Sequence, residues 1–106
     1  MPFDQYHEPP AELPEETRTF ARICASLIEE AEAIGWYEQR LAVEQDGEAR
    51  AIMENAQGEE FKHFAMNLEF LGRRKPRLGR GAEAGPLQVG DIVEHGEKAE
   101  DELDGG

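Results

Sequence analysis

Apolar side chains recur at helical spacing in two segments of the chain. In the first segment the apolar positions are Phe20, Ile23, Leu27, Ile34 and Leu41. In the second they are Ile52, Met53, Ala56, Phe64, Phe70 and Leu71. Intervals of three and four residues place such side chains on one face of an α-helix. The pattern therefore predicts two amphipathic helices, over about residues 15–44 and 48–73.

Proline and glycine mark the ends of these predicted helices. Pro14 suits the first turn of a helix, whereas Pro76 stops one because proline has no backbone N–H to donate. Between the two helices, Asp46-Gly47 is a turn signal. The sequence therefore predicts an all-α fold with an antiparallel helical hairpin over residues 15–75, preceded by an N-terminal arm over residues 1–14.

The remainder of the chain has a different composition. Residues 76–90 are rich in glycine, as linkers are, so we expect a linker there. Residues 91–106 are strongly acidic, and Asp91 with Glu94 three residues later resembles a helix-capping pair. We expect a short acidic C-terminal helix or tail in this region.

Charge and cysteine content narrow the class of protein. The 106 residues carry a formal net charge of −13, which disfavours nucleic acid and anionic membranes as partners and favours cations. The single cysteine, Cys24, leaves no intrachain disulfide to form and fits a reducing compartment. Because the chain has no long apolar run and no secretory signal, we expect a soluble protein made in the cytoplasm.

Three polar residues interrupt the predicted apolar faces. Glu60 and His63 are three residues apart, so they share one face of the second helix. Glu30 lies sixteen residues before Asp46 and Glu60 fourteen after it, which places the two acids at the same height in a hairpin. A carboxylate on a buried face is costly unless it is paired or binds a metal. We therefore predict that Glu30, Glu60 and His63 bind a metal ion together.

A second copy of the chain would complete this site. Two helices cannot enclose a core between them, so we expect the hairpin to dimerise into a four-helix bundle. Ferritin-like di-iron bundles use a Glu from each of two helices and a Glu-x-x-His from each of two others. One chain supplies half of that set. The carboxylates and imidazole suit iron or manganese better than structural zinc.

Several segments resemble the encapsulated ferritins, over roughly residues 7–77. They are Glu29–Glu32, Trp36–Arg40, Glu59–His63 and Leu68–Arg74, together with His7-Glu8-Pro9 near the start. The resemblance implies a ferroxidase that oxidises Fe(II) to Fe(III) with O₂ at a di-iron centre across a homodimer interface. It also implies further assembly into a ring such as a decamer. Such a protein feeds iron mineralisation and storage inside an encapsulin nanocompartment.

The same resemblance assigns roles to residues. Glu30, Glu60 and His63 match the catalytic iron ligands, and Glu29 and Glu32 match an outer metal site. Trp36 and Tyr37 match aromatic residues beside the centre. Solvated surface acids explain Glu29 and Glu32 nearly as well, and interface packing explains Trp36. Manganese, zinc or calcium can replace iron in a crystal.

Two other functions are compatible with these residues. One is a structural helical hairpin that oligomerises through its apolar stripe without metal. The other is a metal-binding carrier without redox activity. Oxygen uptake in the presence of Fe(II), together with the size of the assembly, distinguishes both from a ferroxidase.

Overall fold

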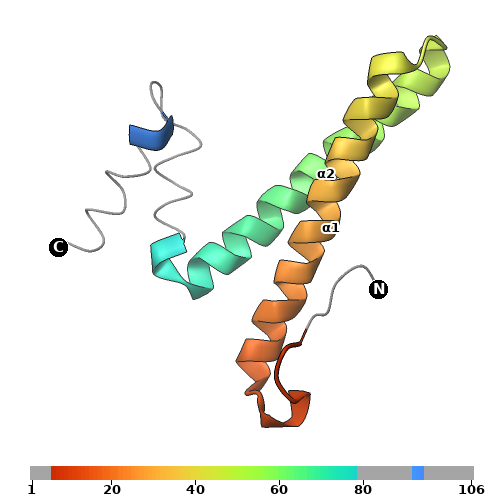
Figure 1. The fold of residues 1–106 in the computed structure, drawn as a ribbon. Helices are drawn as coiled ribbons and strands as arrows, with labels where there is room; N and C mark the ends of the chain where they lie inside the picture. Colours follow the sequence, from red (N-terminus) through yellow and green to blue (C-terminus); the bar gives the residue numbers. More distant parts are fainter. Residues whose placement is uncertain (1–5, 79–91, 95–106) are drawn as a thin grey trace. The chain divides into compact units, whose positions relative to one another are not determined.

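A computed structural model describes residues 6–78 and 92–94 of the chain. The chain forms a short 3₁₀-helix, η1 (Pro10–Glu12), and two long helices, α1 (Glu15–Val43) and α2 (Gly47–Arg74). No strand occurs among the described residues. The predicted all-α helical hairpin is confirmed (Figure 1). Within the described residues, no helix combines the length and the apolar character needed to cross a bilayer.

Helix α1 begins after Pro14, as the sequence predicted, with Glu15 and Glu16 in its first turn. Acidic side chains at this end favour the helix because they face its positive pole. Arg18 donates a hydrogen bond to the Glu15 carboxylate at 3.0 Å. The helix ends at Val43, and the N–H of Glu44 donates to the carbonyl oxygen of Arg40 at 3.0 Å.

The connection between the helices differs from the predicted Asp46-Gly47 turn. Gly47 is already the first residue of α2, so residues 44–46 make the connection. Asp46 precedes α2, and its Oδ1 accepts a hydrogen bond from the N–H of Ala49 at 2.9 Å. This bond satisfies one of the unpaired N–H groups at the start of a helix. Asp46 is therefore a helix cap rather than a turn residue.

Arg50 ties the start of α2 to the end of α1. Its guanidinium donates hydrogen bonds to the backbone carbonyls of Leu41 and Glu44, the latter at 3.1 Å. The last carbonyls of a helix have no partner within it, so a cation that donates to them stabilises that end. Arg50 also pairs with Glu54 at 3.5 Å on the surface of α2.

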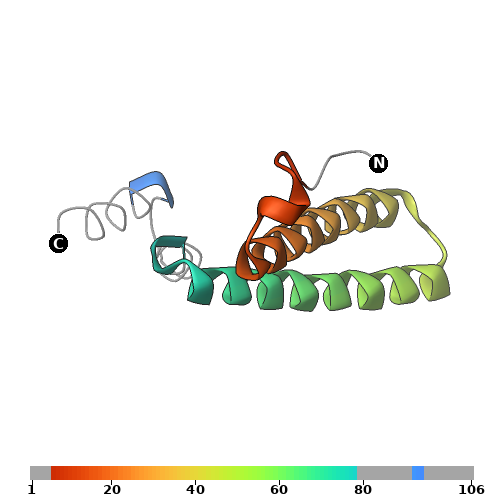
Figure 2. The same cartoon turned by 90° about the horizontal axis from the view of Figure 1, so that it is seen from below.

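The chain divides into two compact units, residues 1–67 and 68–106. In the first unit, α1 and α2 as far as Asn67 lie side by side and antiparallel (Figures 1 and 2). In the second unit, α2 ends at Arg74, whose guanidinium lies 4.2 Å from the ring centroid of Phe70. Residues 76–78 are again helical, although we expected the linker to begin at Pro76, and residues 92–94 form one helical turn. Most of the predicted linker and acidic tail lies outside the described residues.

The apolar faces of the hairpin are incompletely buried in the single chain. Among the described apolar side chains, Leu71 is fully buried, at 2% exposure. Trp36, Ile52 and Met66 are 51%, 71% and 56% exposed. This is the consequence expected of two helices that have no third element to cover them.

Candidate metal centre

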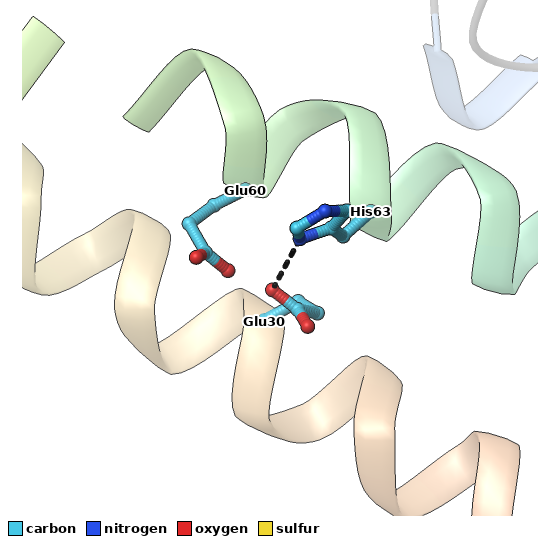
Figure 3. Close-up of side chains that lie close together, drawn as sticks. All are labelled: Glu30, Glu60 and His63. Atoms are coloured by element: carbon cyan, nitrogen blue, oxygen red, sulfur yellow. Dashed lines mark ion pairs between the residues drawn. The ribbon is translucent and has the colours of Figure 1, made fainter. Parts of the chain in front are cut away.

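Glu30, Glu60 and His63 converge between the two helices of the hairpin. Glu30 belongs to α1, and Glu60 and His63 belong to α2. One potential ligand atom from each lies within 4.8 Å of the other two. Nδ1 of His63 lies 3.8 Å from Oε2 of Glu30, and Figure 3 shows all three side chains pointing toward a common point. The structure thus brings together the three residues that the sequence singled out.

Helix geometry explains this convergence. Glu60 and His63 are one turn apart on α2, and the short connection places Glu30 opposite them on the antiparallel α1. The sequence predicted buried faces, but all three residues are half-buried in the single chain. The side chains of Glu30 and His63 are 22% and 43% exposed. The cluster therefore stays accessible to ions from solvent.

The donor atoms of this cluster suit a divalent transition metal. Two carboxylates and one imidazole form a set that binds iron or manganese, and no thiolate takes part because Cys24 lies outside the cluster. Two ligands of one ion can lie at most about 4.2 Å apart, which is twice a metal–oxygen bond of about 2.1 Å. The three groups must therefore close slightly on one ion. Three donors would leave about half of an octahedral shell for other ligands.

The other predicted site residues lie along α1 outside this cluster. Glu29 and Glu32 are both exposed and are not among the groups that converge. Trp36, half-exposed, lines a shallow hollow with Gln39 and Arg40. Tyr37 is half-buried, and the guanidinium of Arg40 lies 5.1 Å from the centroid of its ring. None of these contacts assigns the four residues a metal role.

A neighbouring acid, Glu59, has a different environment. Lys62 Nζ lies 2.9 Å from its Oε2. The hydrogen bond and the positive charge of Lys62 lower the pKa of the Glu59 carboxyl, with a smaller contribution in the same direction from His63, against a small opposing effect of desolvation. Glu59 is therefore an exposed, lysine-paired carboxylate beside the cluster.

One residue next to the cluster was missed in the sequence. Gln57 is only 8% exposed, and its Nε2 donates to the backbone carbonyl of Ile34 at 3.2 Å and to Glu38 Oε1 at 3.0 Å. The signal was present, because Gln57 lies four residues after Met53 and three before Glu60 on the same helical face. A polar residue on that face, like Glu60, needs a partner when the face is covered.

Comparison with known proteins decides the family. A model of the EncFtn-like family matches residues 5–84 of the chain. The chain belongs to the EncFtn-like family. Glu30, Glu60 and His63 all lie within the EncFtn-like region.

Similar proteins come from several bacteria. A "Ferritin-like protein" of Thermotoga maritima is 48% identical over 73 residues, which are 69% of this chain and 64% of that protein. An "Encapsulated ferritin-like protein" of Rhodospirillum rubrum is 45% identical over 67 residues, which are 63% of this chain and 48% of that protein. The match thus spans less than two thirds of each of these relatives, and just under half of the second.

The hairpin also resembles a solved structure. The crystal structure of protein ne0167 from Nitrosomonas europaea is similar with a TM-score of 0.78 and 37% sequence identity. The similarity covers 85% of this chain and 99% of that chain. The EncFtn-like chain therefore shares its arrangement of helices with a protein of known structure.

Proposed function

We propose that this EncFtn-like chain is a ferroxidase, which oxidises Fe(II) to Fe(III) with O₂. The convergence of Glu30, Glu60 and His63 on one point is the observation that supports this most strongly. Carboxylates neutralise the charge of Fe(II) and favour the more highly charged Fe(III). An oxygen-rich ligand set therefore makes oxidation of the bound ion more favourable.

The active form that we propose is a homodimer with a di-iron centre. Each chain supplies one Glu and one Glu-x-x-His, and the ferritin-like di-iron set needs two of each. A two-fold axis beside the cluster would supply the missing half. Exposed apolar side chains such as Trp36 and Ile52 give a second copy a surface to cover. Further assembly into a ring such as a decamer belongs to the same proposal.

Iron is the substrate of this reaction, and the residues of the chain hold it and set its surroundings. Glu30 and Glu60 bind Fe(II), and the imidazole of His63 fixes its position. Four Fe(II) each give one electron to one O₂, which takes up four protons and becomes two water molecules. Outside the cluster, the exposed Glu29 and Glu32 of α1 attract incoming cations. Tyr37 and Trp36, further along α1, help to hold the ligand side chains in position.

The family suggests a destination for the ferric product. We propose that iron passes to mineral stored within an encapsulin nanocompartment in the cytoplasm, as the word "encapsulated" in the name of the Rhodospirillum rubrum relative suggests. A two-helix hairpin encloses no cavity that could hold a mineral. The net charge of −13 fits a protein that handles cations and makes nucleic acid and anionic membranes poor partners.

An aerobic iron assay tests this proposal. Anaerobic protein is mixed with Fe(II), air is admitted, and oxygen uptake and Fe(III) absorbance are followed. Glu30→Ala, Glu60→Ala and His63→Ala should each oxidise iron much more slowly than the wild type, while Glu54→Ala, which removes a surface carboxylate of α2, should not. Equal rates in all variants would contradict the site. Iron binding without oxygen uptake would instead indicate a metal carrier.

A further inference from the structure

Gln57 is a buried polar residue in a hairpin whose other polar residues are mostly accessible. It is 8% exposed, whereas Glu60 and His63 further along α2 are half-buried. A buried amide is unfavourable unless its polar atoms find partners. Nε2 of Gln57 has two, the backbone carbonyl oxygen of Ile34 and the Glu38 carboxylate. Because both partners only accept hydrogen bonds, the NH₂ end of the amide must face α1.

The bond to Ile34 links the helices at a defined height. The carbonyl oxygen of Ile34 is held in the backbone of α1, so it cannot follow α2 if that helix slides. Apolar side chains attract one another without a preferred direction and tolerate small shifts. A hydrogen bond depends on distance and angle. The Gln57 bond therefore restricts the sliding and rotation of α2 against α1.

This link lies next to the cluster. Gln57 precedes Glu60 by three residues, and Ile34 follows Glu30 by four, so the link is about one helical turn nearer the connection between the helices. A register shift of one residue would move α2 by about 1.5 Å and turn its side chains by about 100°. Glu60 and His63 would then no longer face Glu30.

We propose that Gln57 is a positioning residue that fixes the register of the two helices so that Glu60 and His63 face Glu30. A polar side chain at one buried position of a helix pair specifies register in coiled coils in the same way. The expected effect of Gln57 on Fe(II) binding rests on the proposed ferroxidase function. The alignment of the two helices does not depend on a bound ion.

The decisive variant is Gln57→Leu in a Gly58→Ala background. Leucine removes the two hydrogen bonds while keeping a side chain of similar size. Gly58→Ala offsets the loss of stability, because alanine favours helix and a Cβ at Gly58 meets nothing within 4 Å. Gly58→Ala alone is the parent, and Gln39→Leu, which removes an exposed glutamine from α1, is the matched control.

A second pair of variants tests the hydrogen bond itself. Gln57→Glu keeps the shape but points a carboxylate at the Ile34 carbonyl and the Glu38 carboxylate, so it should disrupt the register. Adding Glu38→Gln returns an NH₂ group to the same gap, and it should restore part of what Gln57→Glu loses.

Two measurements report the effect of the Gln57 variants. In the metal-free protein, NMR cross-relaxation between the side chains of Glu30 and His63 reports the register. In anaerobic protein, titration with Fe(II) reports affinity. Gln57→Leu with Gly58→Ala should stay helical, lose the cross-relaxation and bind Fe(II) at least about tenfold more weakly, as with other residues that orient ligands. Gln39→Leu should change neither.

Two results separate the proposals. If Gln57→Leu with Gly58→Ala keeps the Glu30–His63 cross-relaxation, the positioning role is wrong. If the wild type binds no Fe(II) while the same variant loses that cross-relaxation, the ferroxidase function fails and the positioning role stands.

Discussion

Nδ1 of His63 lies 3.8 Å from Oε2 of Glu30, although the two residues belong to different helices. Their proximity depends on how α2 is aligned with α1. It brings an imidazole nitrogen and a carboxylate oxygen to one point, where either can donate a lone pair to a metal. The metal centre that we propose is therefore a product of the hairpin as a whole.

His63→Gln tests the imidazole as a ligand. Glutamine keeps a polar side chain but replaces the imidazole nitrogen with an amide, which is a much weaker ligand for Fe(II). We expect an affinity for Fe(II) lower by at least about tenfold, measured by anaerobic titration. Helical content by circular dichroism should not change. An unchanged affinity would exclude His63 from the site.

Asp46→Ala tests the cap of α2. The variant removes the Oδ1 that accepts the N–H of Ala49, so we expect the free energy of unfolding to fall by about 1 kcal/mol. Urea denaturation measures this change. Asp46→Asn keeps an oxygen at the same place and should retain most of the stability. Equal losses in both variants would mean that charge, and not the capping bond, is responsible.

Gly58→Ala tests whether the glycine inside α2 has a packing role. A Cβ at Gly58 meets nothing within 4 Å in the chain, so only helix propensity should count. We expect the free energy of unfolding to rise by about 1 kcal/mol, measured by urea denaturation at low protein concentration. A lower stability at low concentration would contradict the open surroundings of Gly58, whereas a loss seen only at high protein concentration would show that another molecule packs against this side of α2.

Lys62→Met tests the pairing of Glu59. Lys62 lowers the pKa of the Glu59 carboxyl, so removing the ammonium should raise that pKa toward its ordinary value. Because the folded pKa lies below the unfolded one, the pair stabilises the fold above the unfolded pKa, and this stabilisation is lost as the pH falls through the folded pKa. Both groups are exposed, so the carboxyl titration itself, followed by NMR in metal-free protein, is the measurement. An identical Glu59 titration in both proteins would contradict the pairing.

The helices and the cluster were predictable because both follow from spacing. Apolar periodicity placed the hairpin, and α1 and α2 begin and end within about one residue of the expected positions. Glu30 and Glu60 lie at similar distances from a short connection, so an antiparallel pair had to bring them together.

The contacts that were missed are hydrogen bonds from side chains to the backbone. Arg50 donates to the carbonyls of Leu41 and Glu44, and Gln57 donates to that of Ile34. A backbone carbonyl is present at every residue, so no residue type in the sequence marks the acceptor. The faces of Glu30 and Glu60 are only partly covered in one chain, so their predicted burial depends on a second copy.

The central claim is that two chains share one metal centre. The most direct test is to sediment anaerobic protein with increasing Fe(II) and to measure the bound iron at each step. We predict that tight binding saturates near one ion per chain, that the saturated protein has a mass of at least two chains, and that Glu60→Ala shows neither effect. A saturated wild type that sediments as a single chain would contradict the shared centre. Equal iron binding by the wild type and Glu60→Ala would contradict the site itself.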